Sequence, residues 1–200
     1  MTRLAALALL LPLAATAADD DQRQFFPGFS LVPPAGKAWA LAGREDNSLL
    51  WVRDTGDPDS RFTFAVVAGQ APTSVRSQAD LVAFLERLGA APPPSADLEL
   101  EESTAGPGEG AGPACARHDA VVRDRASGAV LTVAGVTCLH PDYPGRMFDV
   151  QYSRRGPADG QSEALDLEGE ALIRSFRFEE APADDDWSLS GEDRPPHPGG

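Results

Sequence analysis

The chain has 200 residues, of which 42% are hydrophobic and 24% charged, and a formal net charge of −14. This balance is typical of one globular domain and excludes collagen-like and low-complexity chains, although the 19 glycines and 18 prolines are numerous. The excess of acidic residues argues against a nucleic-acid-binding protein, which needs a basic surface.

The first 17 residues have the pattern of an export signal. Arg3 precedes an apolar run over residues 4–13, and residues 15–17 read Ala-Thr-Ala, a typical cleavage site. Because about 20 apolar residues are needed to span a membrane, this run predicts a cleaved signal peptide and no transmembrane anchor. We therefore expect a soluble protein exported to the periplasm or the extracellular space, with a polar leader over residues 18–24.

Residues 25–178 have the pattern of a single α+β domain whose first half is an antiparallel meander. Runs of β-forming residues are separated by turn-forming residues over 43–47 and 54–59. Strands are expected at residues 29–32, 39–41, 48–53 and 61–68.

The clearest predicted element is a helix over residues 77–88. Ser77 is placed to cap its first turn, with Asp80 three residues later, and Gly89 followed by prolines 92–94 ends it. One face carries an apolar stripe made of Leu81, Phe84, Leu85 and Leu88. The stripe predicts that this helix packs on the sheet.

The second half of the domain predicts a long hairpin and a second helix. An edge strand at 97–102 and a flexible Gly-Pro loop at 105–113 come first. Further elements are expected at 115–122, 129–139, 147–153 and 176–178 (strands) and at 163–174 (helix). Within the strand 147–153, the alternation of Phe148, Val150 and Tyr152 predicts burial of these three side chains.

The last 22 residues, 179–200, predict an acidic disordered tail. Seven of them are acidic and only Arg194 is basic, and charge runs of this kind are solvated and repel one another. Trp187 and Leu189 are the exceptions that are able to pack.

The two cysteines predict one structural disulfide, because oxidised cysteines are the rule in exported proteins. A hairpin that turns at Ala126 and Ser127 places Cys115 directly opposite Cys138. Opposed residues in a non-hydrogen-bonded pair lie about 4.5 Å apart at Cα, within the reach of a disulfide. The spacing does not fit a Cys-x-x-Cys redox motif.

The three histidines do not predict a metal site. In the hairpin register His118 faces Gly135, and His140 lies roughly 17 Å away at about 3.4 Å per residue, while His197 belongs to the tail. We find no nucleotide-binding loop, nucleophile elbow or metalloprotease motif. No cofactor is expected.

One local basic grouping stands out in the predicted domain. Arg146, Arg154 and Arg155 are candidates for contact with an anion or a partner, the alternative being a solvated strand end. Trp39 and Trp51, on neighbouring strands, either line a pocket or belong to the core, and core packing is favoured.

The order of these elements resembles a known fold family. Residues 29–34 lead through a Pro-Pro turn to Trp39, a capped helix follows at 77–88, and residues 172–178 read Leu-Ile-Arg-Ser-Phe-Arg-Phe. Over residues 25–178 this arrangement is similar to the PsbP-like fold, an α/β/α sandwich in which two helices pack on an antiparallel β-sheet. The resemblance implies a non-enzymatic binding or accessory protein and assigns no functional residue.

These patterns favour an exported, non-catalytic binding or accessory module of the bacterial envelope. Its partner would be another envelope protein or a small ligand. One alternative is a hydrolase with an unfamiliar acidic or His118-based site, which should show titratable residues converging in a deep pocket. The other is an inhibitor- or immunity-type protein whose acidic ends approach a basic partner.

Overall fold

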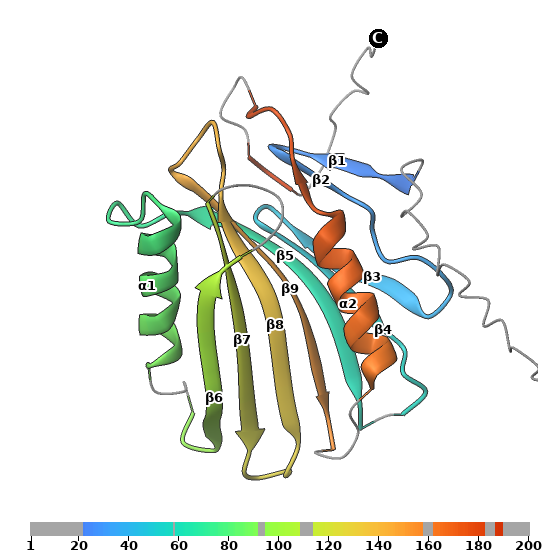
Figure 1. Cartoon of the computed structure of the whole chain (residues 1–200). Helices are drawn as coiled ribbons and strands as arrows, with labels where there is room; N and C mark the ends of the chain where they lie inside the picture. The colour runs from blue at the N-terminus through green and yellow to red at the C-terminus, as the bar shows by residue number, and fades with distance from the viewer. Residues whose placement is uncertain are drawn as a thin grey trace, which may run out of the picture.

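A seven-stranded antiparallel sheet forms the centre of the molecule (Figure 1). The computed structural model describes residues 22–57, 59–91, 95–108, 114–157, 162–182 and 187–189. The expected signal peptide (1–17), leader residues 18–21 and tail residues 183–186 and 190–200 lie outside the described residues. Within them, no helix is both long enough and apolar enough to cross a membrane.

The strand order in the large sheet is β3-β4-β5-β9-β8-β7-β6. Its strands are β3 (Trp39–Glu45), β4 (Ser48–Arg53), β5 (Arg61–Gln70), β6 (Leu98–Pro107), β7 (Cys115–Asp124), β8 (Val130–Leu139) and β9 (Arg146–Gly156). A small second sheet has the order β1-β2-β10 and consists of β1 (Gln24–Phe26), β2 (Phe29–Leu31) and β10 (Arg177–Phe178). The sequence pattern predicted β2 and β10, but it missed β1 and the pairing of the three strands in a separate sheet, because a three-residue strand has too few positions to alternate.

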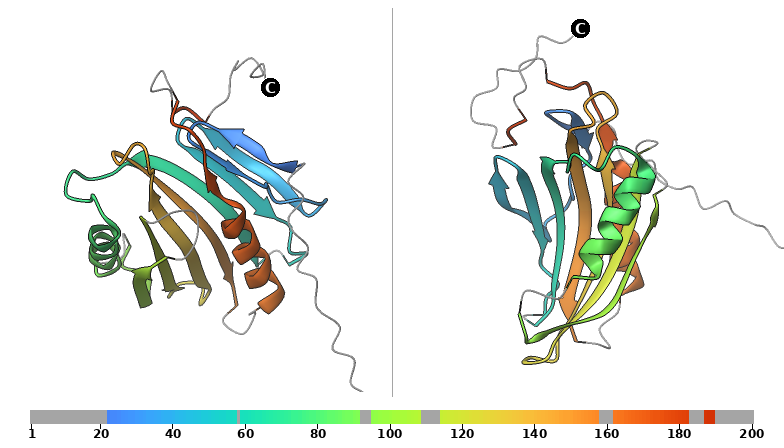
Figure 2. Two further views of the ribbon diagram at one scale, coloured as in Figure 1. Left: turned by 45° about the horizontal axis from the view of Figure 1, so that its top comes forward. Right: turned by 90° about the vertical axis from the view of Figure 1, so that its left-hand side faces the viewer.

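Two helices cover opposite faces of the large sheet. Helix α1 (Gln78–Gly89) packs against Ala116 and Leu139, and helix α2 (Glu163–Ser175) packs against Tyr152. The right-hand view of Figure 2 shows α1 on the near side of the strands and α2 behind them. We call these sides the α1 face and the α2 face. The predicted fold class, α+β with two helices on an antiparallel sheet, is confirmed.

Two strands extend through segments where the sequence predicts turns or loops. Strand β3 continues through residues 43–45 by a bulge between Leu41 and Gly43. Strand β6 includes residues 105–107, because it pairs with β7 as far as Pro107 opposite Ala116. Proline is tolerated there since β6 is an edge strand and needs no N–H on its outer side. Cross-strand pairing therefore overrides the local turn preference at both places.

The main hydrophobic core lies on the α2 face. The predicted alternation in β9 is confirmed, since Phe148, Val150 and Tyr152 are buried there. Trp51 and Trp39 also pack in or against this core, as the favoured interpretation expected: Trp51 lies against Phe64, and Trp39 lies against Phe62. The indole N–H of Trp39 donates to Glu168 of α2 (2.8 Å).

Helix α1 forms as predicted, with Ser77 as its N-cap. The Ser77 hydroxyl accepts the backbone N–H of Asp80 (3.2 Å), and Leu81 is fully buried on the sheet. Gly89 is the last helical residue instead of following the helix, and Ala90 is the C-cap. A methyl group on Gly89 would clash with the Ser103 side chain of β6, so a glycine allows the helix end to approach the sheet closely.

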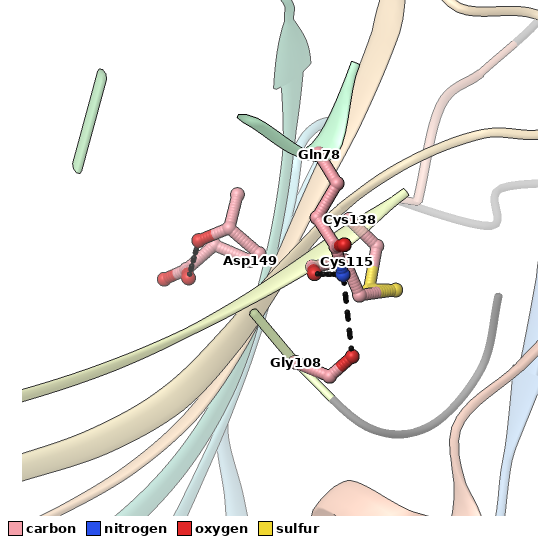
Figure 3. The surroundings of a disulfide bond; sticks show 6 residues. Gln78, Gly108, Cys115, Cys138 and Asp149 are labelled. Atoms are coloured by element: carbon pink, nitrogen blue, oxygen red, sulfur yellow. Dashed lines mark hydrogen bonds between the residues drawn. A yellow bond between two sulfur atoms is a disulfide. The ribbon is translucent and has the colours of Figure 1, made fainter. Parts of the chain in front are cut away.

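The disulfide between Cys115 and Cys138 forms in the predicted register, with the two Cα atoms 4.0 Å apart. Asp124 holds the hairpin turn, because its carboxylate accepts the backbone N–H groups of Ala126 (2.9 Å) and Ser127 (3.2 Å). Figure 3 shows Gln78 beside the disulfide, and its amide donates to the Cys115 carbonyl (2.7 Å). Cys115 therefore links the two faces: its backbone carbonyl is bonded to helix α1, and its sulfur lies in the α2-face core.

The folded body continues beyond residue 178. Trp187 and Leu189 are only 8% and 1% exposed. The Leu189 backbone N–H donates to the carbonyl of Asp46 (2.8 Å), and Arg44 donates to the Leu189 carbonyl (2.7 Å). These two apolar residues, which the sequence analysis singled out within the acidic tail, are thus part of the core.

Candidate functional site

A cavity of about 680 Å³ lies where the β3–β4 turn, the end of β5 and the start of β9 meet the segment 187–189. We call it the apical pocket. It is lined by Asp46, Asn47, Gln70, Ala71, Tyr143, Gly145, Arg146, Trp187 and Ser188. Its residues come from four separate parts of the sequence, so only the tertiary structure assembles it.

Arg146 and Trp187 form one wall of the apical pocket. The guanidinium carbon lies 5.3 Å from the centroid of the indole, a cation–π distance. Burial lowers the pKa of Arg146, and its Nε has no hydrogen-bond partner among the described residues. An arginine remains charged under these conditions, so this wall offers a fixed positive charge against an aromatic surface.

The lining also includes three polar, exposed side chains, one of which, Gln70, lies directly beside Arg146 on the neighbouring strand β5. Asp46, Asn47 and Gln70 are exposed, and the Asp46 carboxylate accepts a hydrogen bond from Ser188 (3.3 Å). Side-chain amides both donate and accept hydrogen bonds, whereas a carboxylate only accepts them. The pocket therefore presents donors, acceptors and both signs of charge, a chemistry suited to recognising a polar molecule.

The three candidate arginines do not form one surface. Arg146 lines the apical pocket, whereas Arg154 lies eight residues further along β9, on the α2 face, 3.9 Å from Asp166. Arg155 points to the other face and pairs with Asp124 (2.9 Å). Successive side chains of a strand alternate between faces, which separates Arg154 from Arg155 although they are adjacent in sequence.

The two described histidines occupy separate structural positions. His118 lies opposite Gly135, as predicted, and its Nε2 contacts the Asp149 carboxylate (2.8 Å), which also accepts the Thr137 hydroxyl (2.8 Å). His140 is fully buried, with Nε2 2.9 Å from the Glu179 carbonyl. In the part of the chain that the structure describes, no three His, Cys, Asp or Glu side chains are placed to hold a metal ion. His197 lies outside that part.

A partly buried ionic cluster fixes α2 to the sheet. Arg117 of β7 makes two contacts with the Glu170 carboxylate (2.6 and 3.0 Å), which also accepts the Tyr152 hydroxyl (3.2 Å). Burial and the negative charge of Glu170 raise the pKa of Tyr152 to about 12. Burial alone would raise the pKa of Glu170, but hydrogen bonds from Arg117 and Tyr152 hold it below its ordinary value.

Sequence reasoning found Arg146 but missed the rest of the apical pocket. Asn47 and Gln70 read as ordinary turn and strand-end residues, because nothing local indicates which polar residues face a cavity. The useful signal was Trp187, an isolated aromatic residue within an acidic segment.

The protein therefore has an α+β fold and a cavity whose volume, about 680 Å³, is large enough for a small molecule. No protein-family model matches the chain, and no curated protein matches it significantly. Among solved structures, it is similar to LpqN, which is involved in cell envelope biogenesis of Mycobacterium tuberculosis, with a TM-score of 0.49 and 17% sequence identity. The match covers 77% of this chain and 86% of the LpqN chain. At this level of similarity the role of LpqN is not transferred, and the PsbP-like resemblance stays a prediction.

Proposed function

We propose that the protein is an exported, non-catalytic binding module of the bacterial envelope that holds a small polar ligand in the apical pocket. The observation that carries the proposal is the cavity of about 680 Å³ whose lining combines Arg146 with Asp46, Asn47 and Gln70. Ligand pockets range from roughly 300 to 1,000 Å³ and hold a few well-placed polar groups.

Export is supported by two independent features of the chain. The N-terminal pattern is that of a signal peptide, and the Cys115–Cys138 disulfide suits an oxidising compartment. N-terminal sequencing of protein recovered from the exported fraction should begin at Ala18. A chain that keeps residues 1–17, or that stays in the cytoplasm, would contradict this part of the proposal.

Binding is favoured over catalysis by the state of the reactive side chains. His118 is held by Asp149 on the α1 face, and His140 is buried against the Glu179 carbonyl. Both cysteines are oxidised in the disulfide. If generic ester, peptide or glycoside substrates are turned over by the purified protein and the turnover is lost in His118→Ala, the hydrolase alternative replaces this proposal.

The pocket is tested by small-molecule retention. The mature protein is mixed with an envelope extract and desalted, and the molecules released on denaturation are identified by mass spectrometry. Asn47→Ala/Gln70→Ala removes two exposed amides, and we expect it to retain at least tenfold less of the ligand, since each lost hydrogen bond costs about 1 kcal/mol. Gln24→Ala, at an exposed position of β1, is the matched control and should retain the wild-type amount. Equal retention by all three proteins would contradict the assignment.

A further inference from the structure

A second cavity, of about 210 Å³, lies on the α2 face between the first turn of α2 and strands β6 to β9. We call it the strand trough. Its lining includes Glu102, Asp119, Thr132, Tyr152, Arg154 and Asp166. It is separate from the apical pocket, because Arg146 and Arg154 are eight residues apart on one strand, or roughly 27 Å at 3.4 Å per residue.

Arg154 forms one end of the strand trough, and one of its guanidinium nitrogens lacks a hydrogen-bond acceptor among the described residues. The residue is 8% exposed, and its Nη1 has no hydrogen-bond partner among the described residues. The nearest carboxylate, that of Asp166, is 3.9 Å away, which is too long for a hydrogen bond. A buried N–H without an acceptor is costly, so an acceptor atom placed in the trough would be stabilised there.

The other end of the trough is acidic. Glu102 is exposed on the edge strand β6 and makes no ion pair with any described residue. Asp119 contacts Arg117 (3.1 Å), but that guanidinium is also engaged by both oxygens of Glu170. The Glu102 carboxylate is therefore free to meet a cation, with Asp119 beside it.

Strand register places these groups in two rows across the sheet. Glu102, Val121, Thr132 and Arg154 lie opposite one another in turn on β6, β7, β8 and β9. Three strand spacings of about 4.8 Å put the outer Cα atoms roughly 14 Å apart. The adjacent row is formed by Asp119, Ala134 and Tyr152. The floor between the acidic end and Arg154 is thus made of small side chains.

We propose that the strand trough binds the N-terminus of a short peptide, with its ammonium group at Glu102 and Asp119 and a neutral carbonyl accepting from Arg154 Nη1. Three carboxylates against one guanidinium give the lining an excess of negative charge, which disfavours an anion. A simple cation would leave Nη1 unsatisfied. In an extended peptide, two residues of roughly 3.4 Å each put the second carbonyl about 7 Å from the ammonium group. The Glu102 and Arg154 side chains extend into the trough and bridge the rest of the roughly 14 Å between their Cα atoms.

The probe is the dipeptide amide alanyl-alaninamide, titrated into the full mature chain and followed by backbone amide NMR shifts. We expect shifts centred on Val121, Thr132 and Arg154, and binding that weakens at high salt because the lining is charged. N-acetyl-alanyl-alaninamide lacks the ammonium group and should bind at least tenfold more weakly. The zwitterion alanyl-alanine should bind more weakly than the amide, since its carboxylate would approach Asp166.

Glu102→Gln removes one carboxylate at an exposed position and should weaken binding of the amide three- to tenfold. Glu86→Gln on the exposed side of α1 removes the same charge elsewhere and should leave binding unchanged. Absence of saturable shifts, equal binding of the acetylated probe, or shifts centred on Asn47 and Gln70 would each overturn the assignment. Shifts centred on Asn47 and Gln70 would place the peptide in the apical pocket, and the other outcomes leave ligand retention by that pocket untouched, so the two proposals fail separately.

Discussion

The two helices cover one sheet, but they bury very different amounts of it. Among the described residues, 20 buried ones form a single cluster on the α2 face, which includes most of the aromatic side chains of the core. Within the same part of the chain, the buried cluster on the α1 face has four residues, Val75, Leu81, Ala116 and Leu139. Hydrophobic stabilisation scales with the apolar area removed from water, so we expect the α2 face to contribute most of the stability.

The difference follows from what covers each face. The α2 face is covered by α2, the small sheet and the segment 187–189, whereas α1 lies along the β6–β7 edge of its face. Elsewhere the α1 face carries polar contacts such as Thr63 with Ser153 (2.6 Å) and His118 with Asp149. The same strands thus have a hydrophobic side and a partly polar side. The following substitutions test how much each side contributes to the free energy of unfolding.

The largest effect is expected from Trp187→Ala. The indole contacts His140, Tyr143 and Phe148, and its removal leaves a cavity in the α2-face core. Such truncations cost about 3–5 kcal/mol, measured as a fall in the free energy of unfolding in urea. Leu81→Ala on the α1 face should cost less. Leu88→Ala, at a residue that is 55% exposed, is the control and should stay near wild type. If Leu81→Ala costs more than Trp187→Ala, the ranking of the two faces is wrong.

Removing the disulfide should have the next largest effect, because the bridge lies in the α2-face core and Gln78 of α1 donates to the Cys115 carbonyl. Cys115 and Cys138 are 23 residues apart, and a closed loop of this length is worth roughly 3 kcal/mol in the chain-entropy model. Cys115→Ser/Cys138→Ser should lose up to this amount, yet keep the fold and any ligand retention. Mass analysis of the exported protein without reductant should find no free thiol, and two free thiols would contradict the pairing.

Substitution of one glycine in each helix tests how tightly that helix packs on the sheet. Gly169 of α2 lies against the Tyr152 ring, which cannot move aside easily because its hydroxyl is bonded to Glu170. Gly169→Ala should therefore cost about 1–3 kcal/mol through overpacking, despite a better helix propensity. Gly89→Ala in α1 meets the Ser103 side chain, whose Oγ can rotate away but whose Cβ would lie 3.0 Å from the new methyl. It should therefore cost less than Gly169→Ala, up to about 1 kcal/mol of unfolding free energy. Equal losses would show that both contacts are equally rigid.

The smallest effect is a pH dependence of the α2 face at alkaline pH. The pKa of Tyr152 is raised to about 12 in the folded protein, against about 10 in an unfolded chain. Below pH 10 the phenol is neutral in both states; above it the unfolded state ionises first, so stability falls as the pH rises towards 12. At pH 11 the loss should be about 1 kcal/mol in wild type. Tyr152→Phe should lack this loss of stability between pH 8 and pH 11, whereas Tyr143→Phe should keep it. The measurement is the urea midpoint of unfolding of each protein at the two pH values.

Much of the fold could be predicted because its signals are local. The cap at Ser77, the apolar stripe of α1 and the alternation in β9 are each contained within one element. The hairpin register followed from one turn, which was enough to pair Cys115 with Cys138. The bounds of β3 and β6 were missed because pairing with a neighbouring strand stabilises residues whose own preferences favour turns.

The candidate sites could be predicted only in fragments. Arg146, Arg154 and Arg155 were selected for being close in sequence, but strand alternation and the length of β9 assign them to three different surroundings. Asn47, Gln70 and Glu102 carry no local signal of facing a cavity.

The sequence by itself determined the α+β class, the capped helix and the disulfide pairing, because backbone preferences and side-chain periodicity act over a few residues. Only the tertiary structure decided that Trp187 and Leu189 complete the core, and that polar residues from four segments surround one pocket. Such contacts join residues distant in the chain, and their free energy depends on which surfaces remain uncovered once the sheet and both helices have formed.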